Sequence, residues 1–280
     1  MASTMFQTSH SFGNDGTGLV LIDQRSIFMC AAGTRASSAQ PAIIIETGSS
    51  GTSSGWIAVQ RLLSAFSLAV SYDRAGYGKS KTPGESPTAS QPLTATKRCE
   101  ELTKLLECDR ADKFPDGWPT LLADASYFDV VGLEKNRVLS YEEWAELKKN
   151  DEGNEPTVAL EEASMKASTD KVNEKVAGKQ AFGDGRLSVI FANESVEMRK
   201  GYDWGVEHGN STAEAREALR KRLEDMAEVD EKGQRAHLSM SSHSKFVYAE
   251  GDARTQSVQV VNPQLIVDEV RWVLEGARRD

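Results

Sequence analysis

The stretch Ser71–Ser80, which reads SYDRAGYGKS, places the strongest constraint on the fold of this chain. The three residues before it, Leu68–Val70, are apolar and predict a short buried strand. Asp73, Gly76 and Gly78 then end the strand in a tight turn, because glycine adopts backbone conformations that other residues avoid. The sequence therefore predicts a buried strand that leads into a structured, glycine-dependent loop.

A βαβ unit is predicted around this loop. Ala42–Glu46 contains three consecutive isoleucines, the pattern of a strand buried on both faces of a parallel sheet. A Gly/Ser-rich loop over 47–55 follows, and apolar residues then recur at helical spacing over 56–66. Two further strands, Leu19–Ile22 and Ser26–Ala31, are predicted before the unit. We therefore predict an α/β protein with a mostly parallel sheet.

Composition limits the partners and the compartment. Hydrophobic residues make up 39% and charged residues 27% of the 280 residues, which fits a soluble globular protein. The net charge of −9 argues against nucleic acid or an anionic membrane as a partner. No apolar run approaches the roughly 18 residues of a membrane span, and residues 1–7 lack the pattern of a secretory signal. Cys30, Cys99 and Cys108 have no metal-binding spacing, so we expect free thiols, a cytoplasmic location, no metal and no cofactor.

The motif Y-D-R-A-G-Y-G-x-S resembles the turn after the fourth strand of α/β-hydrolases, a fold that esterases, lipases and epoxide hydrolases share. The similarity runs from about Leu19 to Leu106. It implies a helical cap over the sheet, ester or amide hydrolysis as the ancestral reaction, and a small hydrophobic or ester-like ligand. It also implies that Gly48, Ser49 and Ser50 form the oxyanion loop, with the Ser49 N–H as the donor. A plain flexible Gly/Ser loop is the alternative.

Later parts of the chain fit the same fold, and the cap is similar to that of fungal-type members. Ser140-x-x-Glu143 is a capping box that predicts the start of a cap helix. The other matching parts are a charge-rich cap helix over 156–176 with one solvent-facing side, the strands 186–192 and 245–249, and a C-terminal helix from Pro263. We therefore assign residues 1–110 and 181–280 to the core and residues 111–180 to the cap.

Two parts that the resemblance requires are missing from the sequence. After Leu106 the chain lacks a buried strand, a G-x-S-x-G elbow and a helix, a gap on the order of 40 residues or more, judged from the size of a βαβ unit. In the loop after the last strand the histidine position falls at Gln256, and an amide cannot take up and return a proton. The four histidines are His10, His208, His237 and His243. All of them precede the last predicted strand.

Two weaker candidates for catalytic residues follow from the motifs. Residues 51–55 fit G-x-S-x-G with Ser53 at the centre, but loop residues separate them from the preceding strand, so the strained turn of an elbow is absent. For the acid, Glu194, Glu197 and Asp203 come closest after the strand 186–192, with Glu194 nearest. Without a histidine to orient, we expect each of these acids to be a surface charge.

The missing segment after Leu106 and the missing histidine determine which activity and which sheet we predict. We expect this form to be hydrolytically inactive, although the sequence leaves open whether the chain is an enzyme. It is either a member from small-molecule metabolism, a ligand- or partner-binding pseudoenzyme, or an incomplete gene model of an active serine hydrolase. Because a buried strand cannot leave its polar groups unpaired, we expect Ile43–Ile45 to pair directly with Leu187–Phe191. Such a shortened sheet predicts poor solubility, and any ligand would lie between the Gly48–Ser50 loop, the Gln256 loop and the cap.

Overall fold

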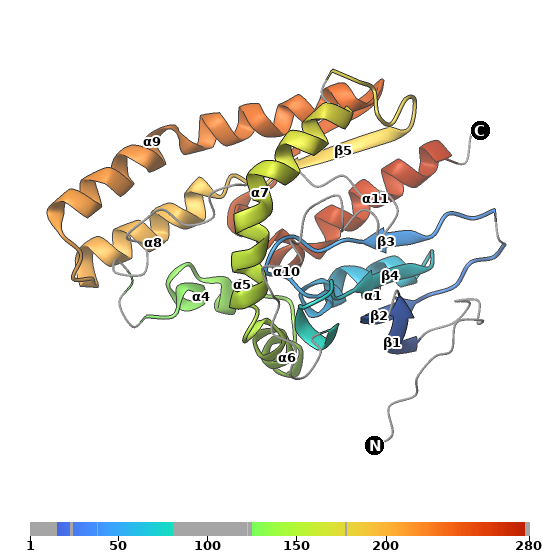
Figure 1. Ribbon diagram of the computed structural model, residues 1–280, viewed down its shortest axis with the longest axis horizontal. Coiled ribbons are helices and arrows are strands. Elements are labelled where there is room, and N and C mark those ends of the chain that lie inside the picture. The colour runs from blue at the N-terminus through green and yellow to red at the C-terminus, as the bar shows by residue number, and fades with distance from the viewer. Residues whose placement is uncertain are drawn as a thin grey trace. The chain divides into compact units, whose positions relative to one another are not determined.

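A computed structural model (Figure 1) describes residues 16–22, 25–37, 39–80, 122, 125–176 and 178–277. The part of the chain after Leu106, where the strand and the elbow are missing, lies outside the described residues. Cys99 and Cys108 lie outside them as well. The chain divides into two compact units, unit 1 with residues 1–111 and 139–177 and unit 2 with residues 112–138 and 178–280. Each unit is described by itself. The predicted boundaries between core and cap stay a prediction.

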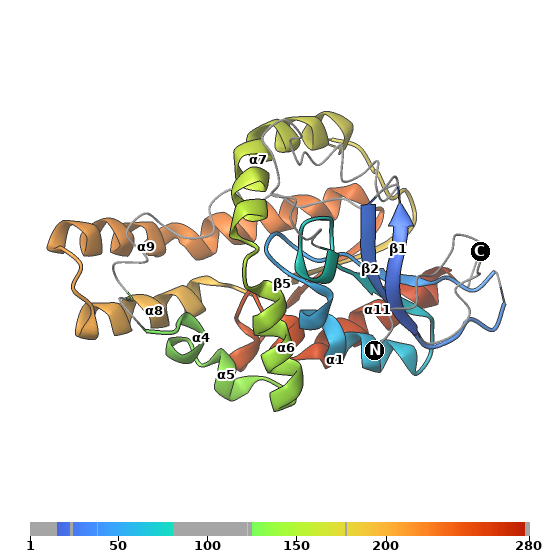
Figure 2. The ribbon, with the colours of Figure 1, turned by 60° about the horizontal axis from the view of Figure 1, so that its bottom comes forward.

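Unit 1 contains a four-stranded sheet in the order β1-β2-β4-β3. The strands are β1 (Gly16–Ile22), β2 (Arg25–Ala32), β3 (Ile43–Ile45) and β4 (Ala69–Tyr72). The first two form the antiparallel hairpin that is visible in Figure 2. The second strand pairs antiparallel with β4, and β3 pairs parallel with β4, with Ile44 opposite Val70. The parallel pair confirms the predicted βαβ unit.

The helices that the structure describes in unit 1 lie between or after these strands in the chain. They are η1 (Ser53–Trp56), α1 (Ile57–Ser64), η2 (Gly78–Ser80), α6 (Tyr141–Asp151) and α7 (Glu155–Val176). The crossover helix α1 buries Val59 and Leu63 and so lies where the helical spacing predicts it. The capping box of α6 is confirmed, because the Glu143 N–H donates to the Ser140 hydroxyl at 3.2 Å and the Ser140 N–H donates back to Glu143 at 2.8 Å.

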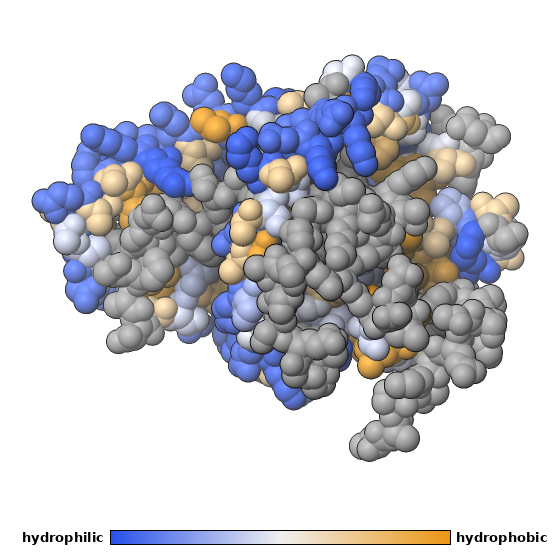
Figure 3. All heavy atoms as spheres, in the orientation of Figure 1, coloured by the Kyte–Doolittle hydropathy of each residue, from blue (hydrophilic) through white to orange (hydrophobic). Residues whose placement is uncertain are grey.

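Unit 2 contains a parallel pair of strands, β5 (Arg186–Phe191) and β6 (His243–Tyr248). Its helices are α4 (Tyr127–Val130), α5 (Leu133–Asn136), α8 (Ser195–His208), α9 (Ala213–Ala236), η3 (His237–Met240), η4 (Gly251–Ala253), α10 (Val258–Val261) and α11 (Pro263–Ala277). The long helices α8 and α9 lie side by side and bury Met198, Leu219 and Leu223 between them (Figure 1). Hydrophilic residues make up most of the visible face of α9 (Figure 3), although Val229 of this helix is exposed.

The two faces of the β5–β6 pair contact different helices. Phe246 lies under the Arg235 guanidinium of α9, with the Cζ atom 4.0 Å from the ring centroid. The next residue, Lys245, places its ammonium 4.3 Å from the Trp272 ring centroid of α11. Since successive side chains of a strand point to opposite faces, α9 and α11 cover opposite sides of this pair.

The expected closure of the sheet stays a prediction, because Ile43–Ile45 belongs to unit 1 and Leu187–Phe191 to unit 2. Within each unit, β3 pairs with β4 and β5 pairs with β6. The predicted burial of β3 on both faces is wrong, because Ile44 is 57% exposed whereas Ile45 is 6% exposed. At three residues, β3 is a short edge strand of the unit 1 sheet, and short edge strands are a common feature of soluble proteins.

Candidate functional site

Asp73 fixes the loop that follows β4. Its carboxylate is fully buried and accepts hydrogen bonds from the backbone N–H groups of Ser53, at 2.7 Å, and Lys79, at 2.8 Å. The Ser80 hydroxyl donates to the Asp73 carbonyl at 2.7 Å and accepts from the Phe28 N–H at 2.7 Å. The loop is therefore bound on one side to the start of η1 and on the other to β2.

Glycine is required twice in this loop, as the sequence predicts. Gly78 has φ +46°, and a Cβ atom there would lie 2.4 Å from the Asp73 carboxylate. Gly76 has φ +83°, and a Cβ atom there would lie 2.9 Å from the Thr157 hydroxyl of α7. Both the left-handed backbone and the close approach of a neighbour exclude larger residues.

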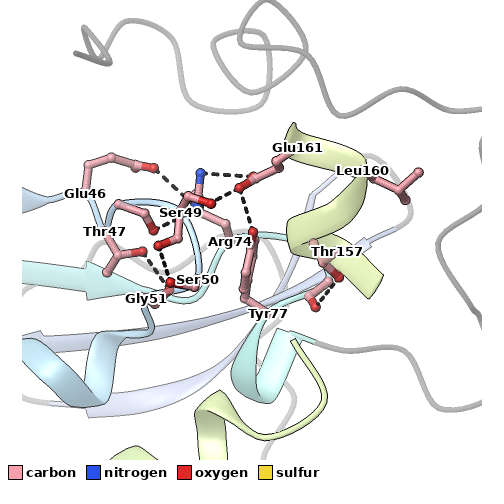
Figure 4. A network of polar contacts seen from close by, with 12 residues as sticks. Glu46, Thr47, Ser49, Ser50, Gly51, Arg74, Tyr77, Thr157, Leu160 and Glu161 are labelled. Atoms are coloured by element: carbon pink, nitrogen blue, oxygen red, sulfur yellow. Dashed lines mark hydrogen bonds and ion pairs between the residues drawn. The ribbon is translucent and has the colours of Figure 1, made fainter. Parts of the chain in front are cut away.

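Arg74 and Tyr77 of the same loop bind the carboxylate of Glu161 from α7 (Figure 4). The two terminal nitrogens of Arg74 lie 3.0 and 3.2 Å from the two Glu161 oxygens, and the Tyr77 hydroxyl donates to Glu161 at 2.6 Å. Arg74 also donates to the Gly48 carbonyl at 2.8 Å. The Arg74 side chain is only 2% exposed. Because a planar guanidinium fork matches a carboxylate, this is a strong and directional contact.

Two carboxylates lie near the single positive charge of Arg74. Besides Glu161, a second carboxylate lies close: Glu46, the residue after β3, has an oxygen 3.8 Å from the Arg74 Nε atom. Burial, followed by the nearby Glu161 charge, raises the pKa of Tyr77, so this phenol stays a hydrogen-bond donor. Two acids thus share one buried arginine at the carboxyl ends of β3 and β4.

The predicted oxyanion loop is a tight turn. The Gly51 N–H donates to the Gly48 carbonyl at 3.2 Å, and Ser50 has a left-handed backbone, with φ +64°. Asn154, just before α7, donates from its side chain to the Ser50 carbonyl at 3.2 Å. The Ser49 side chain lies near the Tyr77 hydroxyl. The structure therefore brings Gly48, Ser49 and Ser50 to the Arg74 network, and their role as oxyanion donors stays a prediction.

Ser53 lies in a structural setting. The residue is 5% exposed, and its backbone N–H is held by Asp73. Its side chain lies near the Cys30 thiol, whose pKa is raised mainly by burial. These surroundings favour a role for Ser53 in anchoring η1.

In unit 2, Glu197 contacts the loop of the missing histidine. Glu197 is 2% exposed and accepts a hydrogen bond from the backbone N–H of Gln256 at 3.0 Å. Burial and the Glu197 carboxylate together raise the pKa of Tyr127, whose hydroxyl bonds to that carboxylate. Our expectation that these acids are surface charges is wrong for Glu197 and for Glu194, a residue that is only 7% exposed. The expectation is confirmed for Asp203, which is exposed. Glu194 directly precedes α8 and Glu197 lies in its first turn, and both are buried.

A serine, a histidine and an aspartate also meet in unit 2, at positions that the motifs did not indicate. The Ser242 hydroxyl lies 2.6 Å from the Asp184 carboxylate and 3.0 Å from His243 Nδ1. The serine lies between the other two groups, whereas in a catalytic triad the histidine must lie between the serine and the acid. All three residues are exposed, so this cluster is a surface hydrogen-bond group.

Comparison with solved structures identifies the fold. A candidate lipase from Acinetobacter baumannii AYE superposes with a TM-score of 0.50 over 95% of this chain and 93% of its own, at 10% sequence identity. The chain has an α/β-hydrolase fold. A loop variant of a haloalkane dehalogenase from Bradyrhizobium elkanii, which also has an α/β-hydrolase fold, gives a TM-score of 0.49 at 13% identity, over 95% of this chain and 98% of its own. No family model matches the sequence.

One curated relative adds information about length. A Hormonema carpetanum protein named "Probable transporter efuK" is 23% identical to this α/β-hydrolase-fold chain, over 96% of the chain. The chain spans only 44% of that protein's length. The aligned stretch is 319 residues long, which exceeds the 280 residues of this chain, so the relative has residues there that this chain lacks.

The described residues contain neither a metal-binding cluster nor a membrane-spanning helix. Among these residues, histidines, cysteines and acids do not gather in any group of three that could hold a metal ion. None of the helices that the structure describes combines the length and the apolar character needed to cross a membrane.

Proposed function

We propose that this α/β-hydrolase-fold chain binds a small hydrophobic or ester-like ligand and, in this form, does not hydrolyse it through a serine. The contact between Glu197 and Gln256 carries the proposal. A buried acid reaches the loop where the fold would place a histidine, but it binds a backbone N–H, and the side chain at that position is an amide. Since the base must touch both nucleophile and acid, this arrangement supports binding without triad chemistry.

The setting of Ser53 supports the same proposal. A nucleophilic serine must present its oxygen to a substrate and hydrogen-bond to a base. Ser53 is buried, and its side chain lies near a thiol whose pKa is raised. The location that we propose for the ligand is the Gly48–Ser50 loop with the adjoining face of α7, at the carboxyl ends of β3 and β4.

We further propose that the chain acts in small-molecule metabolism in the cytoplasm and descends from an ester or amide hydrolase. The greater length of the aligned stretch in the Hormonema protein supports the loss of an internal segment. An incomplete gene model of an active hydrolase would leave the same trace. Sequencing the transcript across Leu106–Asp109 separates these alternatives, because an intervening coding exon would restore the elbow.

Ester turnover and covalent labelling test the proposal. We expect no turnover of p-nitrophenyl esters above the rate of the Ser53→Ala variant, and no labelling by a fluorophosphonate probe. A label on the wild-type protein that is lost in Ser53→Ala would contradict the proposal and identify Ser53 as a nucleophile. Binding of the same esters is measured separately by calorimetry, so that ligand binding and catalysis are distinguished.

A further inference from the structure

Arg74 and Tyr77 form a hydrogen-bond receptor for a carboxylate, which the Glu161 side chain of α7 occupies. We propose that this receptor binds the carboxylate of a small hydrophobic acid, and that Glu161 occupies it when the ligand is absent. This inference rests on the proposed ligand-binding function and specifies the ligand's chemistry. The ligand's carboxylate takes the place of the Glu161 carboxylate in the network of Figure 4.

The receptor is built by the loop after β4 alone. Its three donor groups are the two terminal nitrogens of Arg74 and the hydroxyl of Tyr77, at 2.6–3.2 Å from the Glu161 oxygens. Asp73 fixes the backbone that carries both residues, through contacts that do not involve α7. Only the carboxylate comes from the helix. The loop can therefore keep its donors in place while the occupant changes.

The face that α7 turns toward the loop is polar, which suits a replaceable occupant. Among the described side chains, those that α7 and the residue before it bury are Asn154, Thr157, Glu161 and Ser164. Their spacing of three or four residues places them on one helical face. Thr157 donates to the Gly76 carbonyl at 2.9 Å, and Leu160 points away from the network in Figure 4. A helix held mainly by apolar packing would show the opposite pattern.

A purely structural role explains the Arg74–Glu161 pair less well. Desolvation offsets most of the attraction in a buried ion pair, and apolar residues of similar volume often hold two elements together better. Exchange of one carboxylate for another avoids that difficulty, because the charge around Arg74 and Glu46 stays the same. The site also adjoins the Gly48 carbonyl, at the edge of the sheet where α/β proteins bind ligands.

Calorimetric titration with octanoate, and with octan-1-ol as the neutral control, tests the inference on the full chain. Glu161→Gln should bind octanoate about tenfold more tightly than the wild type, because the competing charge is gone. Arg74→Lys keeps the charge but loses the fork, so octanoate should bind it about tenfold more weakly. Glu162→Gln, the next residue on α7, is exposed and serves as the matched control with wild-type affinity. A folding defect cannot mimic the gain expected for Glu161→Gln.

Equal octanoate affinities for Glu161→Gln and Glu162→Gln would overturn the inference. If octan-1-ol and octanoate bind with equal affinity and the variants change neither affinity, the chain binds hydrophobic ligands but Arg74 and Tyr77 are not a carboxylate receptor. If neither probe binds any variant, the receptor fails together with the binding part of the proposed function. Ester turnover that depends on Ser53 would refute the non-catalytic part alone.

Discussion

The buried carboxylate of Glu197 binds the backbone N–H of Gln256 at 3.0 Å, although 59 residues separate them in the sequence. The contact uses the main chain, so it does not depend on which side chain stands at position 256. The side chain of Gln256 is exposed, whereas Glu197 is almost fully buried. The acid therefore holds the loop in place even though the loop has no histidine.

Replacement of Glu197 should destabilise unit 2 more than replacement of Gln256. Glu197→Ala leaves the Gln256 N–H and the Tyr127 hydroxyl without their acceptor, and each buried unsatisfied group costs about 1–3 kcal/mol. Gln256→Ala should change the free energy of unfolding by less than about 0.5 kcal/mol, as surface substitutions usually do. Urea unfolding followed by circular dichroism measures both. Equal losses for the two variants would show that Glu197 does not hold the loop.

Two glycine substitutions should have opposite effects on stability. Gly78→Ala places a Cβ atom 2.4 Å from the Asp73 carboxylate at a positive φ, so we expect a loss of at least about 1–3 kcal/mol. Gly233→Ala lies in α9 with no atom within 4 Å of the new Cβ, so a gain of about 0.5–1 kcal/mol is expected. Thermal unfolding of both variants measures the difference. A neutral Gly78→Ala would mean that the loop rearranges around Asp73.

Stability should fall in alkaline solution because of Tyr77 and Tyr127. Burial and the neighbouring glutamates raise both pKa values, so the folded state keeps phenolic protons that the unfolded state releases above about pH 10. The two tyrosines contribute fully to stability below that pH. Above it, the free energy of unfolding falls by about 1.4 kcal/mol per pH unit for each tyrosine. Urea unfolding between pH 9 and pH 11 should show a shallower decline for Tyr77→Phe. Tyr141→Phe, at a tyrosine that is 81% exposed, is the control and should decline like the wild type.

Ile44 and Ile45 should respond differently to the same substitution. Ile44→Thr keeps the β-branched shape and removes an exposed apolar group from an edge strand, so the soluble yield should rise with little change in stability. Ile45→Thr places a hydroxyl in the core and should cost about 1–3 kcal/mol. Soluble expression and thermal unfolding are measured for both. Matching losses would mean that β3 is buried on both faces in solution.

The sequence predicts local structure well where one short segment determines it. The turn at Asp73, Gly76 and Gly78 and the capping box at Ser140 are of this kind, since each is built by neighbouring residues. The hairpin and the βαβ unit follow from patterns of apolar residues in the same way. These parts need no information about distant partners.

Contacts between distant segments could not be predicted in this way. The helical spacing of Asn154, Thr157, Glu161 and Ser164 is visible in the sequence, but a buried polar face and a solvated one look the same there. The partner of Glu161 lies 87 residues away at Arg74. Similarly, Glu194 and Glu197 are equivalent candidates until the helix α8 has been placed. The exposure of Ile44 on β3 depends on what covers that side of the strand, which no local pattern reveals.

In the loop after β4, the residues that fix the backbone differ from those that present hydrogen-bond donors. Asp73, Gly76 and Gly78 hold the backbone, and Arg74 and Tyr77 present hydrogen-bond donors. A change at Arg74 that alters what is recognised therefore leaves the backbone contacts of Asp73 in place. With the carboxylate binding that we propose, this separation would allow a new ligand preference to arise by single substitutions, while the backbone contacts of the loop are kept.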